Sequence, residues 1–138
     1  MQEGYSPCYE VPNVPVVFDK DKWGLDKDWI PKNSDDKYEG AILTLKFGMA
    51  NSINTVTAYI MKQFGPHAVV DFAKKIGIQS NMLAVPSLCL GTLDLSVYEM
   101  VGAYSTFVNN GVWIEPIFIT KITDKNGVIL EEFKPKTR

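Results

Sequence analysis

Residues 44–65 read TLKFGMANSINTVTAYIMKQFG, which is two helical patterns separated by a short polar break. Thr44 is a suitable N-cap for a helix over residues 45–50, because its hydroxyl accepts a hydrogen bond from an N–H group of the first turn. Asn and Ser side chains compete for backbone groups, so the letters NSIN after this helix predict a break at residues 52–54. A second helix is expected over residues 55–64.

Two more helices carry start and stop signals. Pro66 favours the first position of a helix and Gly77 is placed to end it, which predicts a helix between these two residues. Ser96 and Glu99 form an S-x-x-E capping box ahead of an apolar stripe. The Asn-Gly pair at residues 110–111 is placed to close that helix.

The chain outside these helices is expected to be extended or β-structured. Residues 1–40 are rich in Pro, Asp and Lys, which favours turns and extended segments, with one short strand predicted over residues 14–18. Residues 78–93 show no sustained period and are expected to form a loop. The β-branched and aromatic runs 117–123 and 128–133 predict an antiparallel hairpin.

The turn of this hairpin is Asp-Lys-Asn-Gly, in which Asn126 and Gly127 are expected to adopt positive φ. Together the patterns predict an α+β fold, mainly helical, with a C-terminal β-hairpin. One domain is expected over residues 1–138, with an extended segment over 1–40, a helical part over 41–111 and the hairpin region over 112–138.

Composition argues against several classes of function. Lys and Arg number 14 against 16 Asp and Glu, a net charge of -2, so no electrostatic attraction favours a nucleic acid. No apolar run reaches the roughly 18 residues that a membrane span needs. His67 has no Cys or His at ligand spacing, which argues against zinc. Cys8 and Cys89 are read as two separate thiols, with one disulfide as the alternative.

Four landmarks follow one another along the chain. They are a W-x-P-x-N segment, a T-L...A-x-S-x-N segment, an L-G...S-x-x-E-M-x-x-A-Y-x-x-F-x-N-x-G helix and a P...I...I-x-D-x-x-G-x-x-L hairpin. Their residues are Trp29, Pro31 and Asn33, followed by Tyr38 and Gly40; Thr44, Leu45, Ala50, Asn51, Ser52, Ile53 and Asn54; Leu90, Gly91, Ser96, Glu99, Met100, Ala103, Tyr104, Phe107, Asn109 and Gly111; and Pro116, Phe118, Ile119, Ile122, Asp124, Gly127 and Leu130. This ordered set resembles the middle of the transpeptidase domain of class A, bifunctional penicillin-binding proteins.

The resemblance implies a β-lactamase/transpeptidase-like fold and an acyl-transfer enzyme that works through a Ser-x-x-Lys nucleophile, a Ser-x-Asn loop and a Lys-Thr-Gly strand. In the family, the nucleophilic serine attacks the D-Ala-D-Ala end of a peptidoglycan stem peptide, and the amine of a second peptide resolves the acyl-enzyme. The expected partners are stem peptides and lipid-linked glycan strands, with β-lactams as ligands of the complete domain. No cofactor is implied. The location implied is the periplasmic face of the cytoplasmic membrane, with the membrane anchor outside this segment.

Within the Ser-x-Asn motif, the resemblance assigns Ser52 to catalysis and Asn54 to substrate binding. A hydroxyl both donates and accepts, so Ser52 suits proton transfer between the catalytic lysine and the leaving amine. The amide of Asn54 suits a peptide group of the substrate, or the lysine itself. On local statistics alone, Ser52 is better explained as a residue that ends one helix or caps the next, and Asn54 as a capping residue. The ordered landmarks favour the functional interpretation.

The other two elements of the family's site are not recognised in this chain. Ser34 and Lys37 spell Ser-x-x-Lys, but they lie in an acidic, turn-like segment without an apolar helix to hold the pair. Lys136 and Thr137 begin like Lys-Thr-Gly, but Arg138 stands where the small Gly is needed. The chain is therefore expected to be an internal fragment that holds no nucleophile and is inactive alone.

A function of a different class stays open, namely a non-catalytic interaction or scaffold module in cell-wall assembly that kept the helices and lost the chemistry. Helices without their usual neighbours expose apolar surface, so self-association of the chain is a further expectation. His67 follows Pro66 at a helix start, and we expect a surface residue there rather than a general base.

Overall fold

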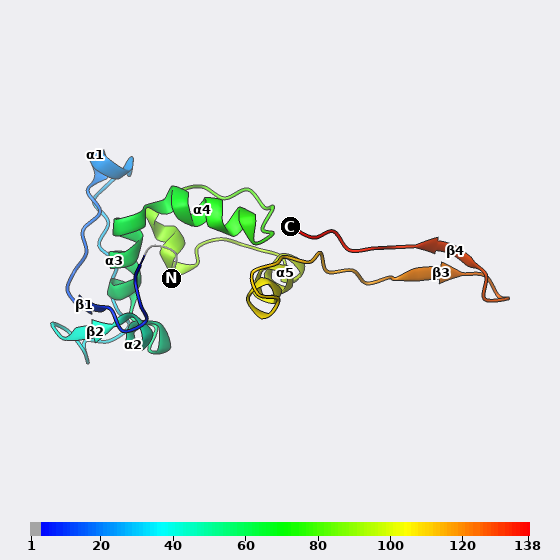
Figure 1. Cartoon of the computed structure of the whole chain (residues 1–138). Coiled ribbons are helices and arrows are strands. Elements are labelled where there is room, and N and C mark those ends of the chain that lie inside the picture. Colours follow the sequence, from blue (N-terminus) through cyan, green and yellow to red (C-terminus); the bar gives the residue numbers. More distant parts are fainter. Residues whose placement is uncertain (1–3) are drawn as a thin grey trace. The chain divides into compact units, whose positions relative to one another are not determined.

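A computed structural model describes residues 4–138 and divides the chain into two compact units. One unit holds the chain up to Val69 together with Leu83–Leu93, and the other holds Val70–Met82 together with Asp94–Arg138. Each unit combines helix with a two-stranded antiparallel sheet (Figure 1), which confirms the α+β expectation.

Helix α3 is the centre of the first unit. The elements of this unit are β1 (Glu10–Pro12), α1 (Lys20–Trp23), β2 (Ile42–Thr44), α2 (Leu45–Ala50), α3 (Asn54–Phe64), the start of α4 (Pro66–Lys75) and the 3-10 helix η1 (Pro86–Leu90). β1 and β2 pair antiparallel, with Val11 opposite Leu43. α3 contacts α2, β1 and η1 (Figure 1), so its position determines how the unit packs.

Two apolar clusters form the core of the first unit. The cluster between the sheet and the start of α3 contains Val11, Leu43, Ile53 and Val56. The other contains Val16, Phe18, Ala58 and Met61, with Trp23 and Trp29 packed against it. Val11 and Phe18 are fully buried, so both clusters exclude water at their centres.

The helix signals around residues 44–65 are confirmed. Thr44 Oγ1 accepts a hydrogen bond from Phe47 N at 3.2 Å, as expected for the N-cap of α2. At the end of α3, Gly65 has φ 79° and donates its N–H to Met61 O at 2.8 Å. A glycine in this position ends a helix without steric cost, which is why α3 stops there.

The expected strand over residues 14–18 is wrong. Phe18 forms an isolated antiparallel bridge with Trp29, and the strand of this region is β1. Pro15 has no N–H to donate in the middle of the stretch, whereas Val11 and its neighbours find a partner in β2. Pairing with a distant strand, rather than local propensity, decided where β structure forms.

Two short helices lie where none was expected. α1 follows Asp19, whose carboxylate accepts hydrogen bonds from two N–H groups of the first turn at 3.0 Å. η1 lies within the expected loop over residues 78–93, between Pro86 at its start and Gly91, which is left-handed. α1 has four residues and η1 has five, which is too short to show a helical period in the sequence.

The second unit contains the end of α4, α5 (Val97–Val108), β3 (Lys121–Thr123) and β4 (Ile129–Glu132). The capping box at the start of α5 is confirmed, because Glu99 N donates to Ser96 Oγ at 3.2 Å and Ser96 N donates to Glu99 Oε2 at 3.3 Å. Asn110 and Gly111 follow α5 with φ 53° and 89°, as expected for a helix end.

The predicted hairpin is confirmed as β3 and β4, but its turn is built differently from the expectation. Gly127 has a positive φ of 85°, whereas Asn126 has not, so the expectation for Asn126 is wrong. Asp124 Oδ1 accepts hydrogen bonds from Asn126 N at 2.8 Å and from Val128 N at 2.9 Å. A carboxylate that bonds the backbone two residues on closes the turn without a left-handed Asn.

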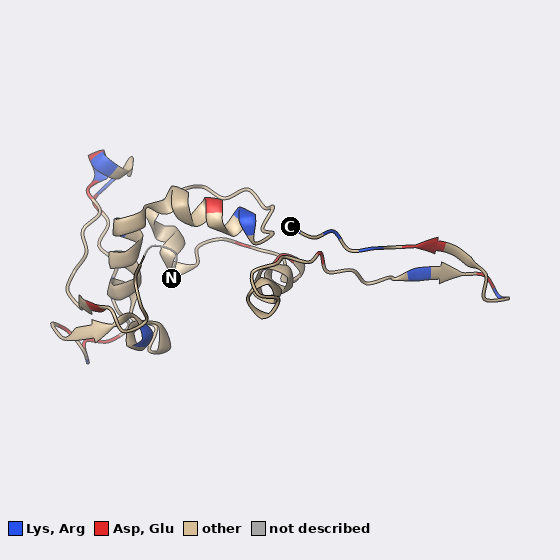
Figure 2. Ribbon diagram, viewed as in Figure 1, with Lys and Arg blue, Asp and Glu red and all other residues tan. Residues whose placement is uncertain are grey.

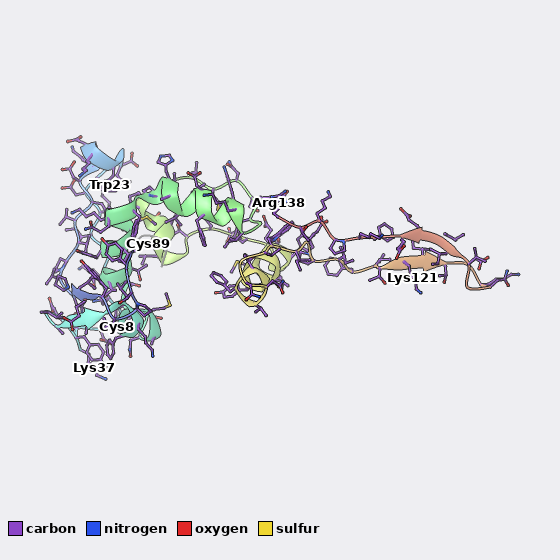
Figure 3. The ribbon with its side chains drawn as sticks, in the orientation of Figure 1. Cys8, Trp23, Lys37, Cys89, Lys121 and Arg138 are labelled. Carbon is purple, nitrogen blue, oxygen red and sulfur yellow. The ribbon has the colours of Figure 1, made fainter. Side chains whose placement is uncertain are left out.

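Trp113 is the buried aromatic residue of the second unit. A Cβ atom on Gly77 or on Gly102 would collide with its indole, so both positions need glycine for close packing. The backbone of Trp113 exchanges two hydrogen bonds of 3.0 Å with Arg138. The Arg138 guanidinium, labelled in Figure 3, also lies 5.1 Å from the ring centroid, within the range of a cation–π contact.

Charged residues of both signs are interspersed, as in α1, where Lys20, Asp21 and Lys22 are neighbours (Figure 2). This agrees with the small net charge of -2. Within residues 4–138, none of the helices has both the length and the apolar character that crossing a bilayer demands.

Candidate active-site residues of the Ser-x-Asn turn

Ser52 lies in a Schellman turn that ends α2. Asn51 is the C-cap residue, and Ser52 follows it with a φ of 52°. Ser52 N donates to Met49 O at 3.2 Å and Ile53 N donates to Gly48 O at 2.8 Å, which are the two hydrogen bonds of this motif. The residue after the C-cap is usually Gly, because a side chain is strained at positive φ. Ser52 therefore stands where local structure favours glycine.

The Ser52 side chain is available for chemistry. The residue is exposed, and its hydroxyl takes part in none of the side-chain hydrogen bonds found within residues 4–138. Ile53 is the N-cap residue of α3, so the interpretation of Ser52 as the cap of that helix is wrong, whereas its interpretation as a helix-ending residue is confirmed. Backbone strain that the surroundings hold in place is common at functional sites.

Asn54 is the first residue of α3, and its side chain is anchored outside the helix. Its Nδ2 donates a hydrogen bond to the backbone oxygen of Lys32 at 2.7 Å, so it does not cap the helix. This bond uses one N–H of the amide and leaves the second N–H and the carbonyl oxygen for another partner. The anchor fixes the direction in which these two remaining groups point.

Ser52 and Asn54 line the same groove, which has a volume of about 550 Å³. Its other walls come from α2, α3, η1 and Gly91, and the residues are Leu45, Gly48, Met49, Val56, Thr57, Ile60, Cys89, Leu90 and Gly91. Burial raises the pKa of the Cys89 thiol to about 11, so this thiol stays protonated at neutral pH and is a poor nucleophile. The groove is largely apolar, and the hydroxyl of Ser52 and the amide of Asn54 are polar groups on its wall.

Ser34 and Lys37 lie in a bend and a turn, and both are exposed. Lys37 Nζ lies 5.0 Å from the centroid of the Tyr38 ring, and hydrogen bonding by the Tyr38 side chain raises the pKa of the Lys37 ammonium. The Lys37 side chain projects outward (Figure 3). A general base must be deprotonated before it acts, and a raised pKa opposes this. That this pair is not a nucleophile and base stays a prediction.

Lys136, Thr137 and Arg138 lie in the second unit and run along the backbone that begins at Trp113. Glu115 N donates to Lys136 O at 2.8 Å, and Lys136 N donates to a Glu115 carboxylate oxygen at 3.2 Å. The bulky Arg138 side chain covers the indole of Trp113. Residues 136–138 pair like a strand with residues 113–115. They contain no Gly that would let a substrate approach the backbone closely.

The remaining candidate residues do not gather into a site. His67 is exposed in the first turn of α4. Cys8 and Cys89, both labelled in Figure 3, are free thiols, so the disulfide alternative is wrong. Across the described part of the chain, no group of three His, Cys, Asp or Glu side chains could hold a metal ion.

Three residues that shape the start of α3 were not identified from the sequence. A Cβ atom on Gly48 would lie 2.6 Å from Val56 Cγ1, so glycine permits the close approach of α2 and α3. Asn13 and Thr55 are only 2% and 5% exposed and hydrogen bond to each other across 42 residues. No periodic pattern in the sequence marks two residues that pair over such a distance. The one signal in the sequence is the position of Asn13 between Pro12 and Pro15.

Comparison with known proteins agrees with this arrangement. Residues 12–138 match the family described as the penicillin binding protein transpeptidase domain. The chain is 40% identical over 110 residues to penicillin-binding protein 1A of Aquifex aeolicus, covering 80% of this chain and 15% of that protein. It is 33% identical over 132 residues to penicillin-binding protein 2D of Bacillus subtilis, covering 96% of this chain and 19% of that protein. The chain thus spans less than a fifth of either relative.

Solved structures show the same fold. The crystal structure of penicillin-binding protein 1A from Haemophilus influenzae matches with a TM-score of 0.84 and 30% identity, over 98% of this chain and 20% of that chain. Penicillin-binding protein A from M. tuberculosis, solved as an imipenem acyl-enzyme complex, matches with a TM-score of 0.72 at 13% identity, over 99% of this chain and 35% of that chain. The chain belongs to the penicillin-binding protein transpeptidase domain family, and within it to the class A group that penicillin-binding proteins 1A represent.

Proposed function

We propose that this chain supplies the Ser-x-Asn part of a peptidoglycan D,D-transpeptidase, in which Ser52 carries a proton and Asn54 binds the substrate. The observation that carries the proposal is the Schellman turn of α2. Ser52 occupies the left-handed position that favours glycine, and its hydroxyl, which has no hydrogen-bond partner among residues 4–138, lines the same groove as Asn54. Family membership over residues 12–138 supports the reaction class. The nucleophile and its lysine are expected outside residues 1–138.

The proposed acylation joins the Oγ of a catalytic serine to the carbonyl carbon of the penultimate D-Ala of a stem peptide. The peptide bond to the terminal D-Ala breaks, and D-Ala leaves with the transferred proton on its amine. The lysine takes up the hydroxyl proton of the catalytic serine. The Ser52 hydroxyl both donates and accepts, so it passes a proton from the lysine to the leaving amine. The amine of a second stem peptide then attacks the ester, forms the cross-link and releases the serine.

The proposal includes partners and location. Stem peptides carried on lipid-linked glycan strands are the substrates, and the complete domain takes β-lactams as ligands. The imipenem acyl-enzyme of penicillin-binding protein A from M. tuberculosis supports this ligand class. The site faces the periplasm, with the membrane anchor outside this chain. No nucleic acid is proposed as a partner, because the net charge is only -2.

The test uses a complete transpeptidase domain that contains this chain and measures the rate of acylation by a fluorescent penicillin. Ser52→Ala removes one hydroxyl, and the acylation rate should fall roughly 10²- to 10⁴-fold. Ser52→Gly should lose the same activity while raising the free energy of unfolding by about 1 kcal/mol, because Gly is unstrained at positive φ. Asn54→Ala removes the side-chain amide and leaves its hydrogen-bonding partner on the substrate unpaired. Substrate binding should weaken by about 1–3 kcal/mol.

Circular dichroism confirms that each variant is folded, and Asn110→Gly is the control because Asn110 is the other non-glycine residue with positive φ within residues 4–138. Its substitution should leave acylation unchanged. If folded Ser52→Ala is acylated at the wild-type rate, Ser52 only ends a helix and the catalytic proposal is wrong.

A second test uses the 138-residue chain itself. It should form no covalent adduct with the same penicillin in mass spectrometry, because Ser34 and Lys37 lie exposed in a bend and a turn. A stable acyl adduct on Ser34 would contradict this expectation and place the nucleophile within the chain.

The alternative function as an interaction or scaffold module is favoured by one observation, the exposure of apolar residues on α5. Val97, Tyr104, Phe107 and Val108 are 80%, 66%, 68% and 83% exposed. Such a surface favours association with another protein or a second copy of the chain. A complete domain that associates but resists acylation by penicillin would select this alternative.

A further inference from the structure

Helix α3 begins without a cap of its own. Its N-cap residue is Ile53, whose side chain cannot accept a hydrogen bond. The first N–H groups of a helix have no partner within the helix, so an uncapped start next to the Ser52 turn is free to fray. The sequence S-I-N-T contains three polar side chains, yet none of them caps this helix.

Asn33 supplies the missing cap from another part of the chain. Its Oδ1 accepts a hydrogen bond from the backbone N–H of Thr55 at 3.1 Å, across 22 residues of sequence. Thr55 is the second residue of α3, which is a position that an N-cap side chain normally satisfies. Asn33 therefore performs for α3 the task that Thr44 performs for α2.

A buried polar network holds the Asn33 side chain in this orientation. Asn33 Nδ2 donates to Asn13 Oδ1 at 2.9 Å and lies 3.2 Å from Thr55 Oγ1. Asn13, which is 2% exposed, also accepts from Thr55 Oγ1 and donates from Nδ2 to Tyr38 O at 2.6 Å. Polar groups buried in a satisfied network have few alternative arrangements, so the network fixes the amide of Asn33.

Lys32, the residue before Asn33, binds the side chain of Asn54. Lys32 O accepts the hydrogen bond from Asn54 Nδ2 at 2.7 Å. The adjacent residues 32 and 33 thus bind the first two residues of α3, one through a backbone oxygen and one through a side-chain oxygen. Ser52 lies two residues before the start of α3, which these two hydrogen bonds hold in place.

We propose that Asn33 is a positioning residue for the Ser-x-Asn motif: by capping α3 at Thr55 beside the Lys32–Asn54 bond, it holds the Ser52 hydroxyl and the Asn54 amide in their working orientation. The inference rests on the proposed function of Ser52 and Asn54. It adds a residue from the Trp29–Asn33 segment that touches no substrate and acts through the helix start.

The test compares Asn33→Ala with Asn33→Asp in a complete transpeptidase domain that contains this chain, by stopped-flow acylation with a fluorescent penicillin. Asn33→Ala leaves the Thr55 N–H uncapped, and the second-order acylation rate constant should fall about tenfold, in line with the loss of one cap of a catalytic helix. Asn33→Asp keeps the oxygen that accepts the Thr55 N–H but loses the Nδ2 donor to Asn13 Oδ1, so it should recover only part of the rate that Asn33→Ala loses.

A merely structural role is separated from a positioning role by a double-mutant cycle with Ser52→Ala. If Asn33 acts through Ser52, Asn33→Ala should lower the rate much less in the Ser52→Ala background than in wild type. Equal losses in the two backgrounds would overturn the inference. Should Asn33→Ala not fold, Asn33→Ser replaces it, because it removes the capping carbonyl and keeps a hydroxyl.

The outcomes also separate this inference from the proposed function. A Ser52→Ala variant that is acylated at the wild-type rate rejects the proposed function, and the positioning role falls with it. A slow Ser52→Ala variant beside an Asn33→Ala variant of wild-type rate rejects only the positioning role. Asn81→Ala, a change of an exposed Asn, is the matched control and should leave the rate unchanged.

Discussion

Each of the two units is stabilised internally by a different kind of contact. In the first unit, two apolar clusters surround α3, and a buried polar network joins Asn13, Asn33 and Thr55. In the second unit, the packing gathers around Trp113, and much of the apolar surface of α5 is exposed. The first unit encloses two apolar clusters and a polar network, whereas in the second unit the long-range contacts gather at Trp113 and at Glu99.

This difference explains where the candidate site lies. A strained turn such as that of Ser52 persists only if its surroundings hold it, and the first unit provides a core and a polar network around the turn. α5 begins with a complete capping box, whose Glu99 also binds the segment after α4, but much of the apolar surface of this helix is exposed. The Ser52 turn thus adjoins a buried core and a polar network, whatever the length of the helices beside it.

The largest expected effect comes from the core of the first unit. Phe18→Ala should lower the free energy of unfolding by about 3–5 kcal/mol, because Phe18 is fully buried among aromatic and aliphatic neighbours. Phe118→Ala in the second unit is the matched control, since Phe118 is 88% exposed and its loss should cost no more than about 0.5 kcal/mol. Denaturant unfolding followed by circular dichroism measures both. Equal losses would remove the distinction between the two units.

The next effect concerns the packing around Trp113. Gly77→Ala places a Cβ atom against the indole and should destabilise the second unit by about 1–3 kcal/mol through overpacking, beyond the strain of a positive φ. Gly111→Ala is the control, because Gly111 also has positive φ but meets nothing within 4 Å. The difference between the two variants isolates the collision. If hydrogen exchange of the α5 amides accelerates equally in both, Trp113 does not organise this unit.

Sequence reasoning succeeded where the cause is local and failed where it is distant. The capping bonds of Thr44, of Gly65 and between Ser96 and Glu99 span no more than four residues, so their patterns predicted the helix ends. The pairing of β1 with β2 and the capping of α3 by Asn33 join segments that no local period connects. The Ser-x-Asn residues were found through the family resemblance, but the left-handed backbone of Ser52 was not, since a serine there contradicts local preference.

A smaller effect is expected at the start of α5. Ser96→Ala removes the oxygen that accepts the Glu99 N–H and should lower the free energy of unfolding by about 1 kcal/mol. Ser105→Ala on the same helix is the control. Ser105 Oγ donates to Val101 O within the helix, and Ala is a better helix former, so this change should cost nothing. An unfolding midpoint of Ser96→Ala that matches the parent would show that the capping box adds no stability.

Glu99 links the start of α5 to the segment after α4 within the second unit. Its Oε1 accepts hydrogen bonds from Gln79 N at 2.9 Å and Ser80 N at 2.7 Å, and its Oε2 accepts from Ser80 Oγ at 2.8 Å and Ser96 Oγ at 3.0 Å. Hydrogen bonds from Ser80 and then from Gln79 lower the pKa of the Glu99 carboxyl to about 2. The capping box therefore also acts as a contact between two segments.

The smallest expected effect is the acid dependence of this contact. The pKa of Glu99 in the folded chain, about 2, lies below its ordinary value of 4.5, so between these values the unfolded chain binds more protons. The stability that Glu99 contributes is therefore complete above pH 4.5 and is lost as the pH falls towards 2. In Glu99→Gln this part of the acid dependence should vanish, whereas in Glu131→Gln, a change on exposed β4, it should persist. Hydrogen exchange of the α5 amides at pH values between 2.5 and 5 measures the difference, and an unchanged slope in Glu99→Gln would show that the contact between the two segments does not depend on this carboxylate.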